Sequence, residues 1–295
     1  MPAQELRSTR SGTSEVRRLA RGCISRARKL LESPSLTDAA VHQARKEIRK
    51  SRAAVRLLRE ALGQARFRRE NERLRDVGRA LNGARDARVL VLTLGVLQRS
   101  HPSLARDRAV QVLSERLRER QRAERRALHR SGAPVAAARR TLAQTQFSAG
   151  QWPVGDSGWE MLGPAFRRLY AAGRQAARES RRRPDDGRLH EWRKQVKNLR
   201  HALQVFEPLQ PAKLSKQAKL ARRLADSLGD GHDLALLRQS ADGLDSKPLL
   251  TAIDRRRRDL RRRVFALADK LYAESPGDMD KRLRGYWLRW RRDPK

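Results

Sequence analysis

The same basic amphipathic helix occurs twice in this chain. Residues 42–59 read HQARKEIRKSRAAVRLLR, and residues 190–206, which begin 148 positions later, read HEWRKQVKNLRHALQVF. In both stretches the apolar residues recur at the three- and four-residue spacing of a helix that buries one face. Another pair of segments also corresponds, LNGARD at 81–86 and LGDGHD at 228–233. Because the period is far longer than that of a solenoid, the duplication predicts two similar helical bundles that face each other.

The polar face of each repeat is almost uniformly cationic. At 3.6 residues per turn the side chains of this face fall within an arc of about 120°. Like charges four residues apart destabilise a helix by about 0.2–0.5 kcal/mol per pair, so a solvated face usually mixes acids with bases. A polyanion would convert this repulsion into charge-assisted hydrogen bonds. We therefore predict a polyanion-binding surface, whose candidate residues are His42, Arg45, Lys46, Arg49, Lys50, Arg52, Arg56, His190, Arg193, Lys194, Lys197, Arg200 and His201.

The composition agrees with a helical, polyanion-binding protein. The net charge is +36, which favours a polyanionic partner and costs the compact state through self-repulsion. Strand signals are weak, while apolar residues keep a helical spacing in most segments, so we predict an all-α fold rather than disorder. The expected helices lie at about 14–32, 37–62, 66–82, 86–99, 103–131, 134–145, 159–182, 185–207, 212–229, 233–241, 247–273 and 278–292.

A stretch rich in Gly, Ser and Pro, at 146–158, separates the two repeats. We predict a flexible N-terminus at 1–12, a first helical half at 13–145, a linker at 146–158 and a second half at 159–295. Polar residues able to cap helices precede several expected helices. We expect Thr37 or Asp38 and Asp185 or Asp186 to cap the two basic helices, and Asp86 and Asp233 to cap two further ones.

Nothing in the sequence predicts an oxidising compartment or a membrane span. Cys23 is the only cysteine, so an internal disulfide is excluded. The N-terminal segment lacks the apolar stretch of a signal peptide, and the longest uncharged apolar run, 89–98, is too short to cross a bilayer. We expect a cytoplasmic protein.

The two basic motifs resemble the repeated motif of the CHAD family, the conserved histidine α-helical domain. They are HxxRKxxRKxR from His42 and HxxRKxxKxLR from His190, and the second is the closer match. The turns near Asp86 and Asp233 and the segment FRRLYAAGRQAARES at 166–180 are similar as well. The resemblance extends over roughly residues 13–290.

The resemblance implies two four-helix-bundle-like halves related by a pseudo-two-fold axis, with the motif helices lining a basic cavity or groove. It also implies binding of inorganic polyphosphate without catalysis or a cofactor, and association with polyphosphate granules is left open. One departure is His201, where the family often carries Tyr. The implied secondary positions for polyphosphate contact are Tyr170, Arg174, Arg75 and Arg222.

Nucleic-acid binding is the main alternative, because net charge does not choose among polyanions. Aromatic residues are only 4% of the chain, too few for the stacking platforms of single-strand binders. The basic faces hold almost no Asn or Gln suited to base edges, and no helix-turn-helix, RNA-recognition or zinc-finger pattern is present. Membrane-surface binding through the amphipathic helices is a weaker alternative, because we expect their apolar faces in bundle cores.

An enzyme that processes polyphosphate or phosphoesters through His42 or His190 is the remaining alternative. Neither histidine has a carboxylate at a spacing that would orient it, and the surrounding cations should keep both imidazoles neutral. His101, His129 and His232 are isolated in the sequence, and no Cys/His cluster with metal-ligand spacing occurs. We therefore expect no catalytic residue, no metal site and no membrane insertion, with the oligomeric state left open.

Overall fold

The structure is a computed structural model that describes residues 6, 12–32, 36–81, 83–155 and 158–292, without the side chains of 83–86 and 128–131. All the regular elements in these residues are helices, and no strand occurs among them, so the predicted all-α fold is confirmed.

The first bundle consists of four long helices and one short one. Its first helix packs against the second and the last, and the third long helix packs against the same two. The apolar stripe predicted for 42–59 is confirmed, because Ile48, Val55 and Leu58 are fully buried in this bundle. The helices are α1 (Gly12–Leu31), α2 (Asp38–Leu57), α3 (Arg59–Leu62), α4 (Gln64–Ala80) and α7 (Ala133–Gly150).

The second bundle consists of α8 (Trp159–Arg182), α9 (Asp186–Phe206), α10 (Pro211–Ser240) and α11 (Lys247–Leu271), with α12 (Pro276–Arg292) against α8. A short 3₁₀ turn, η2 (Glu207–Leu209), joins α9 to α10. Successive helices pack in a square, α8 on α9, α9 on α10, α10 on α11, and α11 back on α8. The apolar stripe of 190–206 forms much of its core.

The predicted break between 229 and 233 is wrong, because α10 is one continuous helix. Gly229 is buried inside it, facing Arg193 of α9, and Asp233 is mid-helix instead of at an N-cap. Packing against α9 and α11 stabilises the helix through two glycines that local propensity would disfavour. Likewise α5 begins at Gly83, so Asp86 is in its first turn, and α7 continues to Gly150, into the predicted linker.

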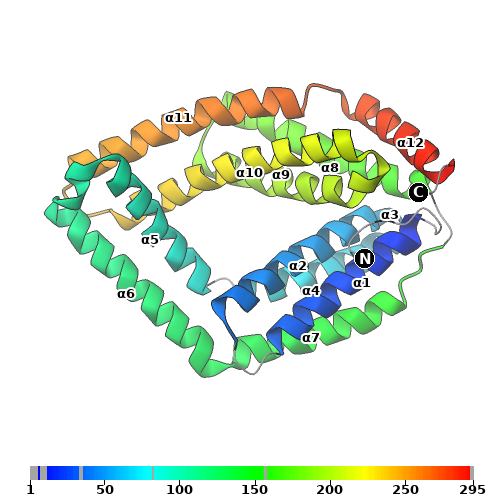
Figure 1. Cartoon of the computed structure of the whole chain (residues 1–295), viewed down its shortest axis with the longest axis horizontal. Coiled ribbons are helices and arrows are strands. Elements are labelled where there is room, and N and C mark those ends of the chain that lie inside the picture. Colours follow the sequence, from blue (N-terminus) through cyan, green and yellow to red (C-terminus); the bar gives the residue numbers. More distant parts are fainter. Residues whose placement is uncertain (1–5, 7–11, 33–35, 82, 156–157, 293–295) are drawn as a thin grey trace.

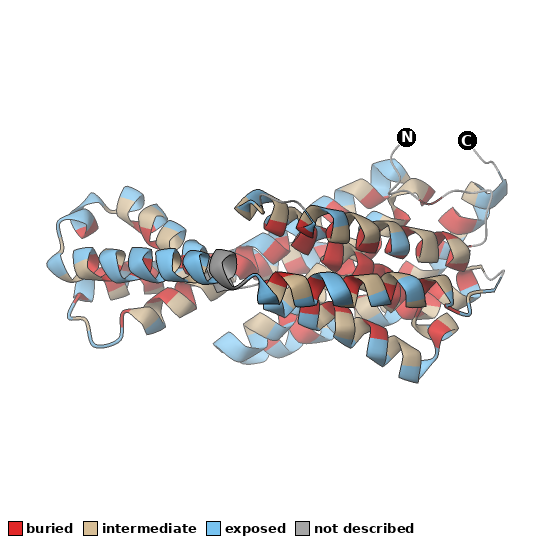
Figure 2. Ribbon diagram, turned by 90° about the horizontal axis from the view of Figure 1, so that it is seen from below, coloured by how far each residue is buried: buried red, intermediate tan, exposed pale blue. Residues whose placement is uncertain are grey.

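The segment between the two parts of the first bundle forms an arm. It comprises α5 (Gly83–Ser100), the 3₁₀ turn η1 (Pro102–Ala105) and α6 (Arg108–Ser131). Its apolar residues belong to a separate small core that includes Leu94, Leu113, Leu237 and Ile253, so the arm packs on the ends of α10 and α11. The predicted halves therefore divide the sequence, but the arm of the first half crosses to the second (Figure 1). In Figure 2 the buried residues are sparse along the arm and continuous in the bundles.

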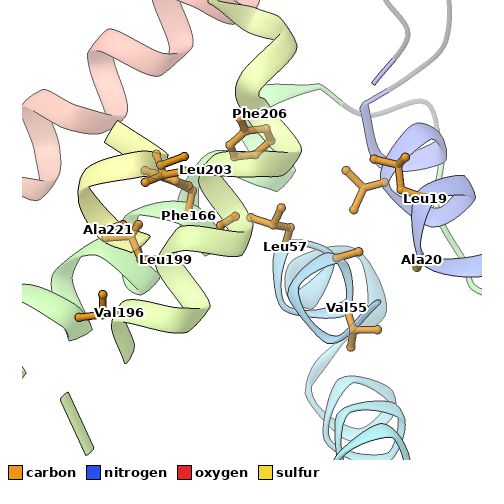
Figure 3. Packing of buried hydrophobic residues seen from close by; sticks show 14 of the residues in the cluster. Leu19, Ala20, Val55, Leu57, Phe166, Val196, Leu199, Leu203, Phe206 and Ala221 are labelled. Carbon is orange, nitrogen blue, oxygen red and sulfur yellow. The ribbon is translucent and has the colours of Figure 1, made fainter. Parts of the chain in front are cut away.

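The two bundles share one apolar core where α2 meets α9. Figure 3 shows Leu57, at the C-terminal end of α2, pointing toward Phe166 and Phe206 of the second bundle. The basic helices run in the same direction, converge at their C-terminal ends and diverge toward their N-terminal ends, where the arm spans the distance between them (Figure 1). This arrangement positions the candidate site.

Candidate functional site

Both basic helices are started by a side-chain cap, as the sequence predicts. Thr37 Oγ1 accepts a hydrogen bond from the backbone N–H of Ala40 at 3.1 Å, and Asp185 Oδ1 accepts one from Arg188 at 2.8 Å. Each cap satisfies an N–H that the helix itself cannot bond, which fixes the first turn. The motif histidines follow about one turn later, so the cationic faces begin at the same depth in both helices.

The cationic faces meet where α2 and α9 converge. Arg49 and Arg56 of α2 and Arg200 of α9 all act on the imidazole of His201. Burial, reinforced by these cations, lowers the pKa of His201 to about 3, so this histidine is neutral at pH 7. Its Nδ1 lies 3.0 Å from Gln204 Oε1. Burial, with Arg52 nearby, also lowers the pKa of Arg56 to about 9, which leaves it cationic. Partly desolvated cations crowded in this way favour an anion.

Neighbouring helices add arginines to each copy. Arg75 and Arg79 of α4 reinforce the lowering of the Arg52 pKa that burial causes, and Arg52 Nε donates to Asn71 Oδ1 at 3.3 Å. In the second bundle, burial lowers the pKa of Arg200; Asp226 opposes this and Arg222 of α10 adds to it.

The secondary candidates Arg75 and Arg222 therefore lie beside the motif arginines. Arg79, which sequence reasoning did not select, lies there as well. Arg75 Nε is 3.0 Å from Asp76 Oδ1, and Arg222 Nε is 3.5 Å from Asp226 Oδ2.

The N-terminal end of α2 opens onto a cavity of about 580 Å³ beneath the arm. His42 is exposed there, and the walls include Val89 and Leu92 of α5 and Arg125 of α6. Arg45 is only 9% exposed, because its Nη1 donates to the carbonyl of Leu81 at 3.1 Å. Arg45 thus presents only an edge to the cavity.

The N-terminal end of α9 is covered instead of open. The ring of His190 lies 4.4 Å from the ring of His232 on α10, and residues of α11 complete a much smaller pocket. Burial, followed by Lys194 and Arg193, lowers the pKa of His190, and burial together with His190 lowers the pKa of His232 to about 4. His232 was expected to be isolated. The unbroken α10 is what places it here.

The remaining candidates divide between surface and core. Lys46 and Lys194 are exposed, Lys197 and Arg193 are half-buried, and Lys194 forms an ion pair with Glu191. Lys50 is drawn toward buried Glu47, whose Oε1 lies 2.8 Å from its Nζ, so part of its charge is compensated.

The secondary role expected for Tyr170 is wrong. Tyr170 is 1% exposed, and its hydroxyl donates toward the carbonyls of Leu271 and Glu274, so it is a core residue that no polymer can touch. Its spacing on the helix could not distinguish a core phenol from a binding one. Arg174 lies close enough to lower the pKa of Tyr170, against the dominant effect of burial, and is half-buried on α8.

No group of three His, Cys, Asp or Glu able to hold a metal ion occurs among the residues that the structure describes. Within those residues the Nδ1 of His190 is buried without a hydrogen-bond partner, so no carboxylate accepts a hydrogen bond from this nitrogen. The site therefore presents cations and neutral imidazoles.

The fold and the site define an all-α protein of two joined bundles with a basic surface on the helices that join them. The family model described as the CHAD domain matches residues 18–242, so the chain belongs to this family, which is a polyphosphate-binding one. No curated protein sequence matches the chain. In the described part of the chain, no helix is long and apolar enough to cross a membrane.

Proposed function

We propose that the protein binds inorganic polyphosphate, without catalysis, along the facing basic surfaces of α2 and α9. The observation that carries the proposal is the convergence of Arg49 and Arg56 with Arg200 and His201 from the other bundle. These cations repel one another, which makes the charged form of each less favourable. A chain of phosphates would offset this repulsion with short charge-assisted hydrogen bonds. The family membership supports the same ligand class.

A phosphate-only polymer fits this surface better than a nucleic acid does. The amides near the motif arginines are few, and Asn71 and Gln204 are already engaged with Arg52 and His201. The large aromatic side chains of α9, Trp192 and Phe206, are completely buried, so none is available to stack on bases. Arginine forks and lysine ammonium groups supply what phosphate alone requires.

Two of the described histidines add neutral hydrogen-bond donors to the proposed binding surface. The pKa values of His190 and His232 are lowered, so at pH 7 each is a neutral imidazole with one N–H that can be donated to a phosphate oxygen. The single N–H of neutral His201 is directed to Gln204 Oε1 instead. Release of phosphate or shortening of the polymer, lost in His42→Ala or His190→Ala, would instead establish the enzyme alternative.

The direct test reverses two equivalent charges on the facing surfaces. We expect Arg49→Glu combined with Lys197→Glu to weaken long-chain polyphosphate binding at least tenfold at moderate salt, about 1.4 kcal/mol. The matched control is Arg139→Glu with Arg140→Glu, which makes the same charge change on the exposed side of α7. Helicity measured by circular dichroism should be unchanged in both. Equal losses in the two variants would show that total charge, and not this surface, determines binding.

Competition distinguishes the ligand classes. We expect polyphosphate to be displaced poorly by duplex DNA or RNA at equal phosphate concentration across a salt series. Efficient displacement would favour the nucleic-acid alternative. A fluorescent fusion that co-localises with polyphosphate granules, and loses this in the Arg49/Lys197 variant, would extend the proposal to the cell.

A further inference from the structure

A second basic surface lies on α11, on the far side of the second bundle from α2. Helix α11 packs on α8 and α10 and is diagonal to α9 across the core, where Phe265 stacks on Trp192 with 5.6 Å between ring centroids. Because the inward faces of α9 and α11 meet there, their outward faces point in opposite directions. Figure 1 shows α11 along the outer edge, away from the space between α2 and α9. This helix also lies beyond the matched family region, which ends at 242.

Residues 255–263 contain seven arginines and one acid, Asp259. Arg257 turns inward and forms an ion pair with Asp186, and Arg262 forms one with Asp259 at 2.6 Å. Arg255 and Arg258 are exposed and form no ion pair with any carboxylate that the structure describes. They lie three residues apart, on one outward stripe of the helix.

The stripe begins at a cavity between α11 and η1 of the arm. Its volume is about 390 Å³, and its polar lining comprises His101, Ser103, Lys247, Thr251 and Arg255. The Nδ1 atom of His101 is buried and has no hydrogen-bond partner among the described residues, although buried polar atoms are usually satisfied. Two cations, two hydroxyls and an imidazole without an acidic wall make a site for phosphate oxygens.

We propose that this cavity and the adjoining Arg255–Arg258 stripe bind a second segment of polyphosphate, so that one protein molecule can bridge two polyphosphate chains. The inference rests on the proposed function, because it takes the same polymer that α2 and α9 would hold. A nucleic acid is disfavoured here, since the one aromatic residue of α11, Phe265, is covered by Trp192 and by the guanidinium of Arg181, 5.1 Å from the ring centroid. Two sites on opposite faces convert binding into cross-linking when the polymer is long.

The competing explanation is a solvated helix face. Exposed arginines are common, and their pairs contribute little to stability. That explanation accounts for the stripe but not for its continuation into a cavity that gathers Lys247, His101 and two hydroxyls around Arg255. A solvated face also predicts no stoichiometric binding of phosphate, so a titration can distinguish the two explanations.

The test counts sites with tripolyphosphate, which is too short to reach both faces. In calorimetric titration at low salt we expect the full-length protein to bind tripolyphosphate at two classes of site. Lys247→Glu with Arg255→Glu should remove one class, and Arg49→Glu with Lys197→Glu should remove the other. A glutamate at position 247 suits the N-terminus of α11, so folding should be preserved. Arg139→Glu with Arg140→Glu is the control of equal charge.

Bridging is measured with two long-chain polyphosphate preparations that carry different fluorophores. We expect energy transfer between them with the unmodified protein and with the control, and at least a fivefold loss with the Lys247/Arg255 variant, whose affinity for single chains stays within twofold. Unchanged site number and bridging in that variant would overturn the inference and leave the proposed function intact. Preferential bridging of DNA over polyphosphate would overturn it in favour of a nucleic-acid surface. Failure of every form to bind polyphosphate would overturn the proposed function itself.

Discussion

The two copies of the basic helix have similar sequences and different surroundings. His42 is exposed beside a cavity of about 580 Å³, whereas His190 is half-buried against His232. The difference originates in the corresponding segments 81–86 and 228–233. After the first copy, α4 ends at Ala80 and α5 leaves as the arm; after the second, α10 continues unbroken and covers His190. Equivalent local sequences thus adopt different backbone conformations, because different helices pack against them.

The largest expected effect is on stability, at the equivalent apolar positions Ala44 and Trp192. Trp192 is completely buried and stacked on Phe265. We expect Trp192→Ala to lower the free energy of unfolding by about 3–5 kcal/mol, since the cavity that it leaves cannot collapse fully. Urea denaturation provides the measurement. Leu92→Ala, at a side chain that is 54% exposed, should change it by less than about 0.5 kcal/mol. A loss of under 1 kcal/mol at Trp192 would mean that α9 and α11 do not meet across the core.

The next effect concerns the share of each copy in binding. Arg49→Glu and Lys197→Glu, made singly, reverse charges at equivalent positions of α2 and α9. If one polymer lies between the helices, we expect each to weaken polyphosphate binding by roughly three- to tenfold, about 0.7–1.4 kcal/mol. Fluorescence anisotropy at fixed salt measures this. A normal affinity in one single variant would restrict the site to the other helix.

A smaller effect concerns the covered histidine of the second copy and its neighbour on α10. The pKa of His190 is lowered from the ordinary 6.5, and that of His232 is lowered to about 4. The unfolded chain therefore binds these protons at higher pH than the folded chain does, and stability decreases as the pH falls from about 6.5 toward 4. We expect His190→Gln with His232→Gln to reduce the loss of stability between pH 7 and pH 5. Urea titrations at both pH values would contradict this if the double variant and the unmodified protein lost equal stability.

The smallest expected effect is at two glycines, Gly78 and Gly229, on the helices that pack against the two basic helices. A Cβ at Gly78 of α4 would approach only Ile48 Cγ2, at 3.9 Å, whereas at Gly229 of α10 it would meet Arg193 Nη2 at 3.2 Å. We expect Gly78→Ala to stabilise the protein by about 0.5–1 kcal/mol through helix propensity, without a change in binding. Gly229→Ala should displace Arg193 and weaken polyphosphate binding about twofold. Paired thermal denaturation and titration measure both, and identical binding in the two variants would remove Arg193 from the site.

Much of this molecule followed from local patterns. The caps at Thr37 and Asp185, the helical periodicity and the apolar stripes depend on interactions within a few residues, and they were predicted correctly. Tyr170 shows where such reasoning stops, because helical spacing cannot tell a core phenol with two carbonyl partners from a ligand contact. His232 shows the reverse case, a residue isolated in the sequence that lies against His190 in the fold.

The sequence by itself determined the all-α fold, the duplication and the concentration of cations on two helix faces, since each is a matter of periodicity and charge. Only the tertiary structure decided that α5 and α6 cross to α10 and α11, because that choice depends on where Leu94 and Leu113 find apolar partners. It also decided that the N-terminal end of α2 is open while that of α9 is covered, and that Arg49, Arg56 and Arg200 share one surface. Such placements arise from contacts between residues distant in the chain, which no local pattern encodes.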